Sequence, residues 1–189
     1  MKINGHDIEA PRVEEMWREN KIYLDPNFLK DGVTNVVEFL IHNEFNKDQF
    51  GFILVKDPDG QEYAYIQTVP YYASRILPMF DQPDLKGKYT ISVVHPEQDS
   101  CVTTGCLLKR TTFSEFLDSN CNDWLTISSK ALCIDDNKTH ISQFEHSPYL
   151  SSYLLNLVCG PLVSIEAEAE MLYNHIPMKI LCRSKIILL

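Results

Sequence analysis

The residues best suited to chemistry lie between two strand-like runs, in residues 65–94, where the chain reads YIQTVPYYASRILPMFDQPDLKGKYTISVV. One cation, Arg75, is followed there by two carboxylates, Asp81 and Asp84, on either side of Pro83. Two neighbouring carboxylates could work as a general acid and base. Alternatively, they accept from backbone N–H groups or from the guanidinium, and a buried ion pair locks a corner between two strands. Because neither a nucleophile nor a set of metal ligands accompanies them, we favour the structural corner.

The cysteines are the other candidates for chemistry, and there are six: Cys101, Cys106, Cys121, Cys133, Cys159 and Cys182. None belongs to a Cys-x-x-Cys pair, and several lie in apolar runs such as ALCI and NLVCG. We therefore favour buried free thiols. A zinc site built from the first four cysteines remains an alternative, although their spacing matches no common zinc module.

The composition is that of an ordinary globular protein. The chain has 189 residues, of which 44% are hydrophobic and 23% charged, enough for one sizeable domain or two small ones. The formal net charge is -9 and the pI is about 5.1. Because an acidic chain repels phosphate backbones, we expect no nucleic-acid partner.

The distribution of apolar residues bears on membranes and targeting. No run approaches the roughly 18 uninterrupted apolar residues of a membrane helix, and residues 1–12 lack the apolar segment of a secretory signal. We therefore expect no membrane span. We also expect an intracellular, reducing location and no secretion.

The local pattern is mostly that of short strands separated by turns. FGFILV and EYAYIQT flank the sequence Asp-Pro-Asp-Gly at 57–60, which suits a type I turn and predicts a hairpin. Tyr63, Tyr65 and Gln67 would share one face of its second strand. Mostly antiparallel β structure is the predicted fold class.

Helix is predicted in only a few places. Residues 13–20 could form two turns, and residues 72–79 a short turn before Pro83. Residues 114–119 give a weak helical signal, whereas residues 149–158 fit strand and helix equally well.

Several separated blocks resemble the N-terminal domain of the aminopeptidase N family of zinc metallopeptidases. The block YAYIQTVPYYASRILPMFDQPDLKGKYTISVVHP is similar to the family's strand ending in Tyr-Thr-Gln, which is followed by Arg…Phe-Pro-x-Phe-Asp-x-Pro and a second strand. The hairpin DPDGQEYAYIQ, and further on FEHSPYLSSYLLNLVCGPL and HIPMKILCRS, are similar to other family blocks in the family's order. The resemblance covers roughly residues 22–184. The positions that fit the first pattern are Gln67, Arg75, Pro78, Phe80, Asp81, Pro83, Leu85 and Lys86.

The resemblance implies a large, twisted antiparallel β-saddle or sandwich with one or two short helices, packed in the family against a thermolysin-like catalytic domain. Residues 22–186 would form this β domain. Residues 1–21 would form an N-terminal extension with helical turns, too short to supply all the strands that precede this point in the family.

The residues that catalyse in that family are missing from this sequence. Zinc is bound there by His-Glu-x-x-His in the catalytic domain, but none of the six histidines here is followed by Glu, and no Gly-x-Met-Glu-Asn segment occurs. We therefore assign no catalytic residue, no metal ligand and no cofactor to this chain, and we expect no activity from it alone.

One substitution bears on substrate recognition. The resemblance places Gln67 at the position that lines the family's first substrate pocket, as a vestigial contact. The acidic residue that commonly holds the substrate's α-amine maps to Val69, whose isopropyl group cannot bind an ammonium by charge. Arg75, Asp81 and the turn residues would remain as the structural corner.

Two functional hypotheses follow. In the first, the chain is a non-catalytic β domain that acts as an interaction or structural subunit. A protein partner would then cover the face that packs on the catalytic domain in the family. In the second, it is the N-terminal fragment of a zinc aminopeptidase, and Gln67 contributes to a substrate pocket.

Overall fold

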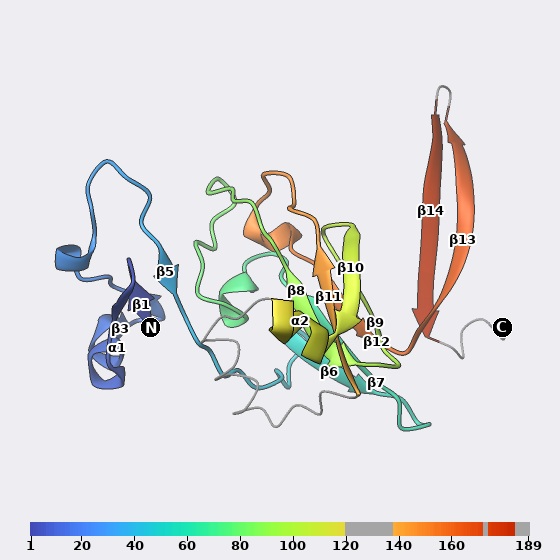
Figure 1. The fold of residues 1–189 in the computed structure, drawn as a ribbon, viewed down its shortest axis with the longest axis horizontal. Helices are drawn as coiled ribbons and strands as arrows, with labels where there is room; N and C mark the ends of the chain where they lie inside the picture. The colour runs from blue at the N-terminus through green and yellow to red at the C-terminus, as the bar shows by residue number, and fades with distance from the viewer. Residues whose placement is uncertain (120–137, 172–173, 184–189) are drawn as a thin grey trace. The chain divides into compact units, whose positions relative to one another are not determined.

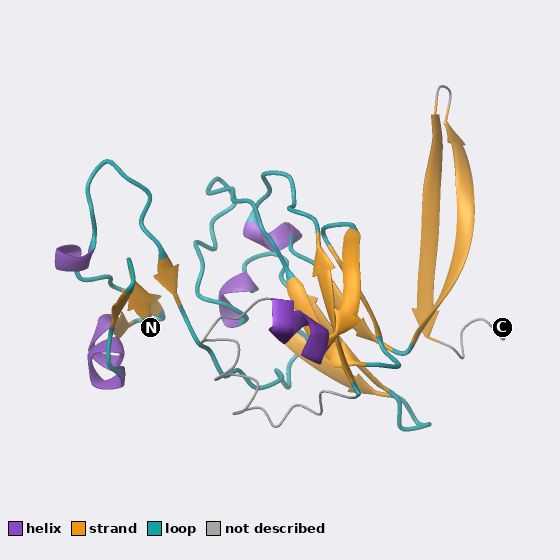
Figure 2. Cartoon of the chain, viewed as in Figure 1, coloured by secondary structure: helices purple, strands orange, loops and turns teal. Residues whose placement is uncertain are grey.

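The computed structural model describes residues 1–119, 138–171 and 174–183. The chain divides into two compact units, unit 1 (Met1–Glu44) and unit 2 (Phe45–Leu189). Strands dominate, every pairing between them is antiparallel in the described residues, and the α-helices are short (Figure 2). The predicted mostly-β class is confirmed.

Unit 1 is a small assembly of short elements. Its elements are β1 (Lys2–Ile3), β2 (His6–Asp7), α1 (Ala10–Met16), β3 (Trp17–Arg18), β4 (Lys21–Ile22), the 3-10 turn η1 (Pro26–Phe28) and β5 (Val37–Glu38). β1 is the middle strand of a sheet with β2 and β5, and β3 pairs with β4. Ile3, Ile8 and Met16 form the buried core.

The helix of unit 1 starts and ends earlier than residues 13–20, where the sequence predicted it. Pro11 occupies its first turn, where a missing N–H costs nothing. Beyond Met16 the backbone becomes extended, and Glu19 and Asn20 both take positive φ angles of 51° and 60°. These two residues form the β3–β4 turn, which no helix can include.

Unit 2 contains two sheets and a separate long hairpin. Its elements are β6 (Gly51–Lys56), β7 (Glu62–Gln67), the 3-10 turn η2 (Ala73–Arg75), β8 (Ser92–Pro96), β9 (Ser100–Thr103), β10 (Leu107–Thr112), α2 (Phe113–Ser119), β11 (Thr139–Phe144), the 3-10 turn η3 (Ser152–Leu154), β12 (Leu157–Gly160), β13 (Leu162–Met171) and β14 (Asn174–Arg183). One sheet has the order β6-β7-β12-β9 and the other β10-β11-β8 (Figure 1). β12 and β11, which come late in the chain, therefore lie between strands that come early.

The predicted β6–β7 hairpin is confirmed. The N–H of Gly60 donates to the carbonyl of Asp57 at 2.9 Å, and the N–H of Asp57 donates to the carbonyl of Gln61 at 2.8 Å. Gly60 has φ +87°, which a side chain would disfavour.

The other helical predictions have mixed outcomes. The helix expected at 114–119 is present as α2, anchored by the buried Phe113. Only η2 forms within 72–79. The ambiguous segment 149–158 divides into η3 and the start of β12, because its last residues pair with two neighbouring strands.

The two sheets enclose a core that contains Cys101, Phe144 and Cys159, with Val93 packed against it. The register places Cys159 directly opposite Cys101, with their Cα atoms 4.3 Å apart, and their sulfurs form a disulfide. The prediction of free thiols is therefore wrong for this pair, because the strand register brings together two cysteines that are 58 residues apart.

The remaining cysteines do not complete the alternative zinc site in the described part of the chain. Cys106 and Cys182 are free. Cys121 and Cys133 lie outside the described residues.

The β13–β14 hairpin is tied to the turn after β6. Arg183, at the end of β14, donates from Nη1 to Asp57 Oδ1 at 2.7 Å, and its guanidinium lies 5.1 Å from the centre of the Tyr63 ring. Gly160, just before β13, also lies close to Tyr63, since a Cβ there would be 2.6 Å from Cδ1 of that ring.

Candidate functional site

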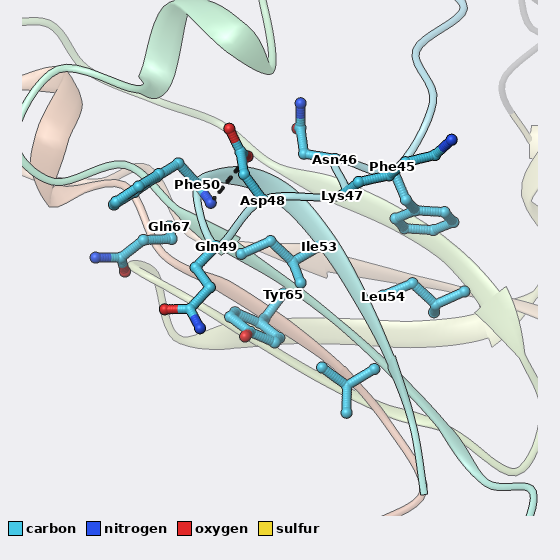
Figure 3. A pocket seen from close by; sticks show the side chains of 11 residues that line it. Phe45, Asn46, Lys47, Asp48, Gln49, Phe50, Ile53, Leu54, Tyr65 and Gln67 are labelled. Atoms are coloured by element: carbon cyan, nitrogen blue, oxygen red, sulfur yellow. Dashed lines mark hydrogen bonds between the residues drawn. The ribbon is translucent and has the colours of Figure 1, made fainter.

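A groove of about 890 Å³ opens along one face of the β6–β7 hairpin in unit 2 (Figure 3). It is lined by residues of the loop before β6 and of both strands: Phe45, Asn46, Lys47, Asp48, Gln49, Phe50, Ile53, Leu54, Val55, Tyr65 and Gln67. Aromatic and amide side chains therefore surround most of it.

The strand register sets the floor of the groove. Gly51 pairs with Gln67, and Ile53 pairs with Tyr65, so these four residues share one face. Tyr63 belongs to the same face but is buried. The predicted common face of Tyr63, Tyr65 and Gln67 is thus confirmed, and it places the Gln67 amide at one end of the groove (Figure 3).

The loop at 45–50 forms the wall because Asn46 folds it back onto β6. The N–H of Asn46 donates to the Phe52 carbonyl at 2.6 Å, and Asn46 Oδ1 accepts from the N–H of Phe52 at 2.8 Å. Gly51 is required at this bend. Its φ is +86°, and a Cβ would collide with the Asn46 side chain.

Asp48 and Arg75 join this wall to the segment after β7. Arg75 Nη1 donates to Asp48 Oδ2 at 2.6 Å, and its guanidinium lies 5.0 Å from the centre of the Tyr72 ring. Tyr72 in turn stacks on Phe50 at 4.2 Å between ring centres. The sequence left two arrangements open for Asp81 and Asp84, which could accept from backbone N–H groups or from Arg75 in a buried ion pair. The ion-pair alternative is wrong in partner and in burial, because Arg75 pairs with Asp48 and the two side chains are 43% and 50% exposed. The backbone alternative is observed for Asp81, which accepts from the N–H of Ser74.

The hydrogen bond from Arg75 holds the pKa of Asp48 below its ordinary value of 3.8, with a further contribution from the N–H of Phe50. The same bond raises the pKa of Arg75. Asp48 is therefore an ionised acceptor at neutral pH and has no proton to give to a substrate.

The other predicted corner residues contact a different segment. Asp81 Oδ2 accepts from the N–H of Ser74 at 3.0 Å, and its Oδ1 accepts from Ser152 Oγ at 2.6 Å. The carbonyl of Pro83 accepts from Ser151 Oγ at 2.5 Å. Asp81 thus connects η2 to η3 through Ser152, which lies 71 residues after Asp81 in the chain.

Asp84 has a more peripheral position. Its side chain is exposed, and its carbonyl accepts from the N–H of Lys86 at 3.2 Å. Asp81 and Asp84 therefore have different surroundings, because Asp81 is engaged by Ser74 and Ser152 whereas Asp84 is exposed.

Comparison with known proteins identifies the family to which this chain belongs. Residues 5–154 match the family model described as the Peptidase M1 N-terminal domain. The chain belongs to this family. The likeness to aminopeptidase N inferred from the motifs is confirmed.

Proteins named Aminopeptidase N are among the relatives of this M1 N-terminal domain. The one from Streptomyces lividans is 25% identical over 182 residues, which cover 96% of this chain and 17% of the relative. The one from Haemonchus contortus is 28% identical over 155 residues, covering 71% and 14%. The one from Bos taurus is 21% identical over 187 residues, covering 95% and 17%. The chain thus spans between 14% and 17% of the length of these three relatives.

In this M1 N-terminal domain, the residue two positions after Gln67 is Val69, which is 49% exposed. The preceding Thr68 is buried, and its hydroxyl donates to the carbonyl of Tyr153 at 2.7 Å. Asp48 is the one carboxylate among the eleven described residues that line the groove, and Arg75 binds it. The chain therefore presents an alkyl group, and no carboxylate, at this exposed position.

Sequence reasoning did not predict the contacts of Asp48 and Phe50 in the M1 N-terminal domain. Both lie in a loop with no regular period, and their contacts depend on residues more than 20 positions away. The available signal was local: the segment NKDQFG ends in the glycine that the bend requires.

No helix in the described part of the chain has the length and apolarity needed to cross a membrane.

Proposed function

We propose that this M1 N-terminal domain acts as a docking module, in which the groove and the adjoining corner bind a protein domain without recognising a substrate α-amine. The exposed position of Val69 carries the proposal. A carboxylate at that place would attract an ammonium group, whereas an isopropyl group offers an apolar contact only.

Exposed apolar side chains of the groove and of the corner segment after β7 support docking. Phe80 is 79% exposed and Tyr71 is 65% exposed, and both lie in the segment that follows β7. Phe45 and Leu54 are exposed at the groove itself. Aromatic residues are enriched at the centres of protein interfaces, where burial repays their contact area.

The second candidate is a contribution to a substrate pocket in a longer aminopeptidase N-type protein. The partly buried amide of Gln67 at the end of the groove favours it. An amide can accept from or donate to a peptide, but it carries no charge.

A reconstitution experiment distinguishes the two candidate functions. This chain is mixed with the Streptomyces lividans relative from which the matching N-terminal segment has been deleted. Docking predicts co-elution in gel filtration and no gain in hydrolysis of amino-acid amides. A pocket contribution predicts co-elution together with restored hydrolysis that is lost in Gln67→Ala.

Matched variants test the surface. Phe80→Asp and Tyr71→Asp should abolish co-elution, whereas Leu108→Asp should not, because Leu108 is also exposed but lies on β10 of the other sheet. Equal behaviour of all three variants, or a wild-type chain that never associates, would contradict docking.

A further inference from the structure

Three side chains that commonly ligate metals converge between the two sheets of unit 2. His95 comes from β8, Cys101 from β9 and Cys159 from β12, and one ligand atom of each lies within 4.8 Å of the others. His95 is 2% exposed, Cys101 9% and Cys159 8%. We propose that this His95–Cys101–Cys159 cluster, when its cysteines are reduced, binds a thiophilic divalent cation of the zinc class.

The fold builds this cluster from strand positions. Cys101 and Cys159 are directly opposed on neighbouring strands, so both sulfurs leave the same face of the four-stranded sheet. With Phe144 they form the buried core against the second sheet, to which His95 belongs. The ligands are therefore held by paired backbone and do not depend on flexible loops.

Two hydrogen bonds hold the ring of His95. Nδ1 lies 2.8 Å from the carbonyl oxygen of Pro96, and because a carbonyl only accepts, Nδ1 carries the proton. In the neutral ring Nε2 then has the lone pair, and it lies 2.8 Å from Ser142 Oγ. A backbone carbonyl that accepts from one ring nitrogen is a usual outer-shell partner of a histidine that binds metal through the other nitrogen. The Ser142 hydroxyl can rotate to release Nε2.

The donor atoms select the class of metal. Two thiolates and one imidazole suit zinc and related cations, whereas calcium and magnesium prefer oxygen ligands. Charge favours a divalent ion, because two thiolates neutralise it and leave no net charge among the apolar side chains of the core.

Metal binding and the disulfide exclude each other. A dithiol reductant supplies two electrons and two protons to the Cys101–Cys159 bond and is itself oxidised to a disulfide. Binding of the cation to the two thiols then releases two protons. The oxidation state of this pair would thus determine whether the site exists.

The test uses the full 189-residue chain with the other four cysteines, Cys106, Cys121, Cys133 and Cys182, replaced by serine. The chain is reduced with a phosphine and titrated anaerobically with cobalt(II), which gives thiolate charge-transfer absorption when sulfur binds it. We expect absorption that saturates at one equivalent and disappears when zinc(II) is added. The oxidised form of the same chain should give none, and this control needs no substitution in the core.

Two variants and one condition complete the test. Cys101→Ser should remove the absorption, and His95→Gln should weaken binding at least tenfold while leaving thiolate absorption at high cobalt. Circular dichroism checks the folding of each variant. Absence of saturable absorption in the reduced chain would overturn the proposal. So would equal affinity in concentrated urea, because unfolded thiols would then explain the binding.

Discussion

Asp48 and Arg75, 27 residues apart in the chain, meet at 2.6 Å beside the groove. Their pairing joins the loop before β6 to the segment after β7, and the Phe50–Tyr72 stack runs alongside it. The bend of the loop, which Gly51 permits, is what brings Asp48 within reach.

The first prediction concerns the acid titration of Asp48. Arg75→Gln should raise the pKa of this carboxyl towards its ordinary value of 3.8, because the main cause of the depression is removed. A carboxyl with a lowered pKa in the folded chain adds stability above 3.8 that is lost as pH falls through the folded pKa. As the pH falls below 3.8, the unfolding free energy of the variant should therefore decrease less than that of the wild type. Carboxyl carbon shifts measured by NMR against pH report the titration.

A control for this experiment is available in unit 1. Arg12 pairs with Asp25 there, and Arg12→Gln should move the titration of Asp25 and leave that of Asp48 unchanged. A shift of Asp48 in both variants would show that net charge, rather than the Arg75 contact, sets its pKa.

The second prediction separates the two aspartates of the corner. Asp81→Ala leaves the N–H of Ser74 and the buried hydroxyl of Ser152 without their acceptor, which should cost about 1–3 kcal/mol of unfolding free energy. Asp84→Ala should change stability by less than about 0.5 kcal/mol, because that side chain is exposed. Urea unfolding of both variants measures the difference. Equal effects would count against Asp81 as the corner's connection.

The third prediction concerns the close approach at Gly160. Gly160→Ala should destabilise the chain by about 1–3 kcal/mol, since the new Cβ would lie 2.6 Å from Tyr63 Cδ1 and 3.1 Å from the carbonyl of Glu62. Gly87→Ala is the matched control, because its nearest atom would be 3.6 Å away. Thermal unfolding should show a lower midpoint for Gly160→Ala alone.

The fourth prediction tests the proposed role of Val69. Val69→Glu places a carboxylate at an exposed position two residues after Gln67. A charge-assisted hydrogen bond contributes about 1.5 kcal/mol or more, so binding of an amino-acid amide should tighten about tenfold. NMR titration with the free amide and with its N-acetylated form measures this. An identical gain for the acetylated form, which has no ammonium, would refute the explanation.

The sequence predicted best where the signal is local. The β6–β7 hairpin follows from a four-residue turn and two alternating runs, so Tyr65 and Gln67 share a face as expected. Contacts that depend on distant register were not predictable from one sequence. To predict the Cys101–Cys159 disulfide, one would have to know that β9 and β12 are neighbouring strands. The ion pair between Arg75 and Asp48 depends on the path of an irregular loop.

The order of strands has a consequence for biosynthesis. In each of the two larger sheets of unit 2, one inner strand, β11 or β12, is encoded after all the other strands of its sheet. As the nascent polypeptide leaves the ribosome, β7, β8, β9 and β10 must each wait with an unpaired edge until residues 139–160 emerge. Vectorial translation therefore imposes a late, concerted closure of both sheets. During that interval the nascent chain should need chaperones most.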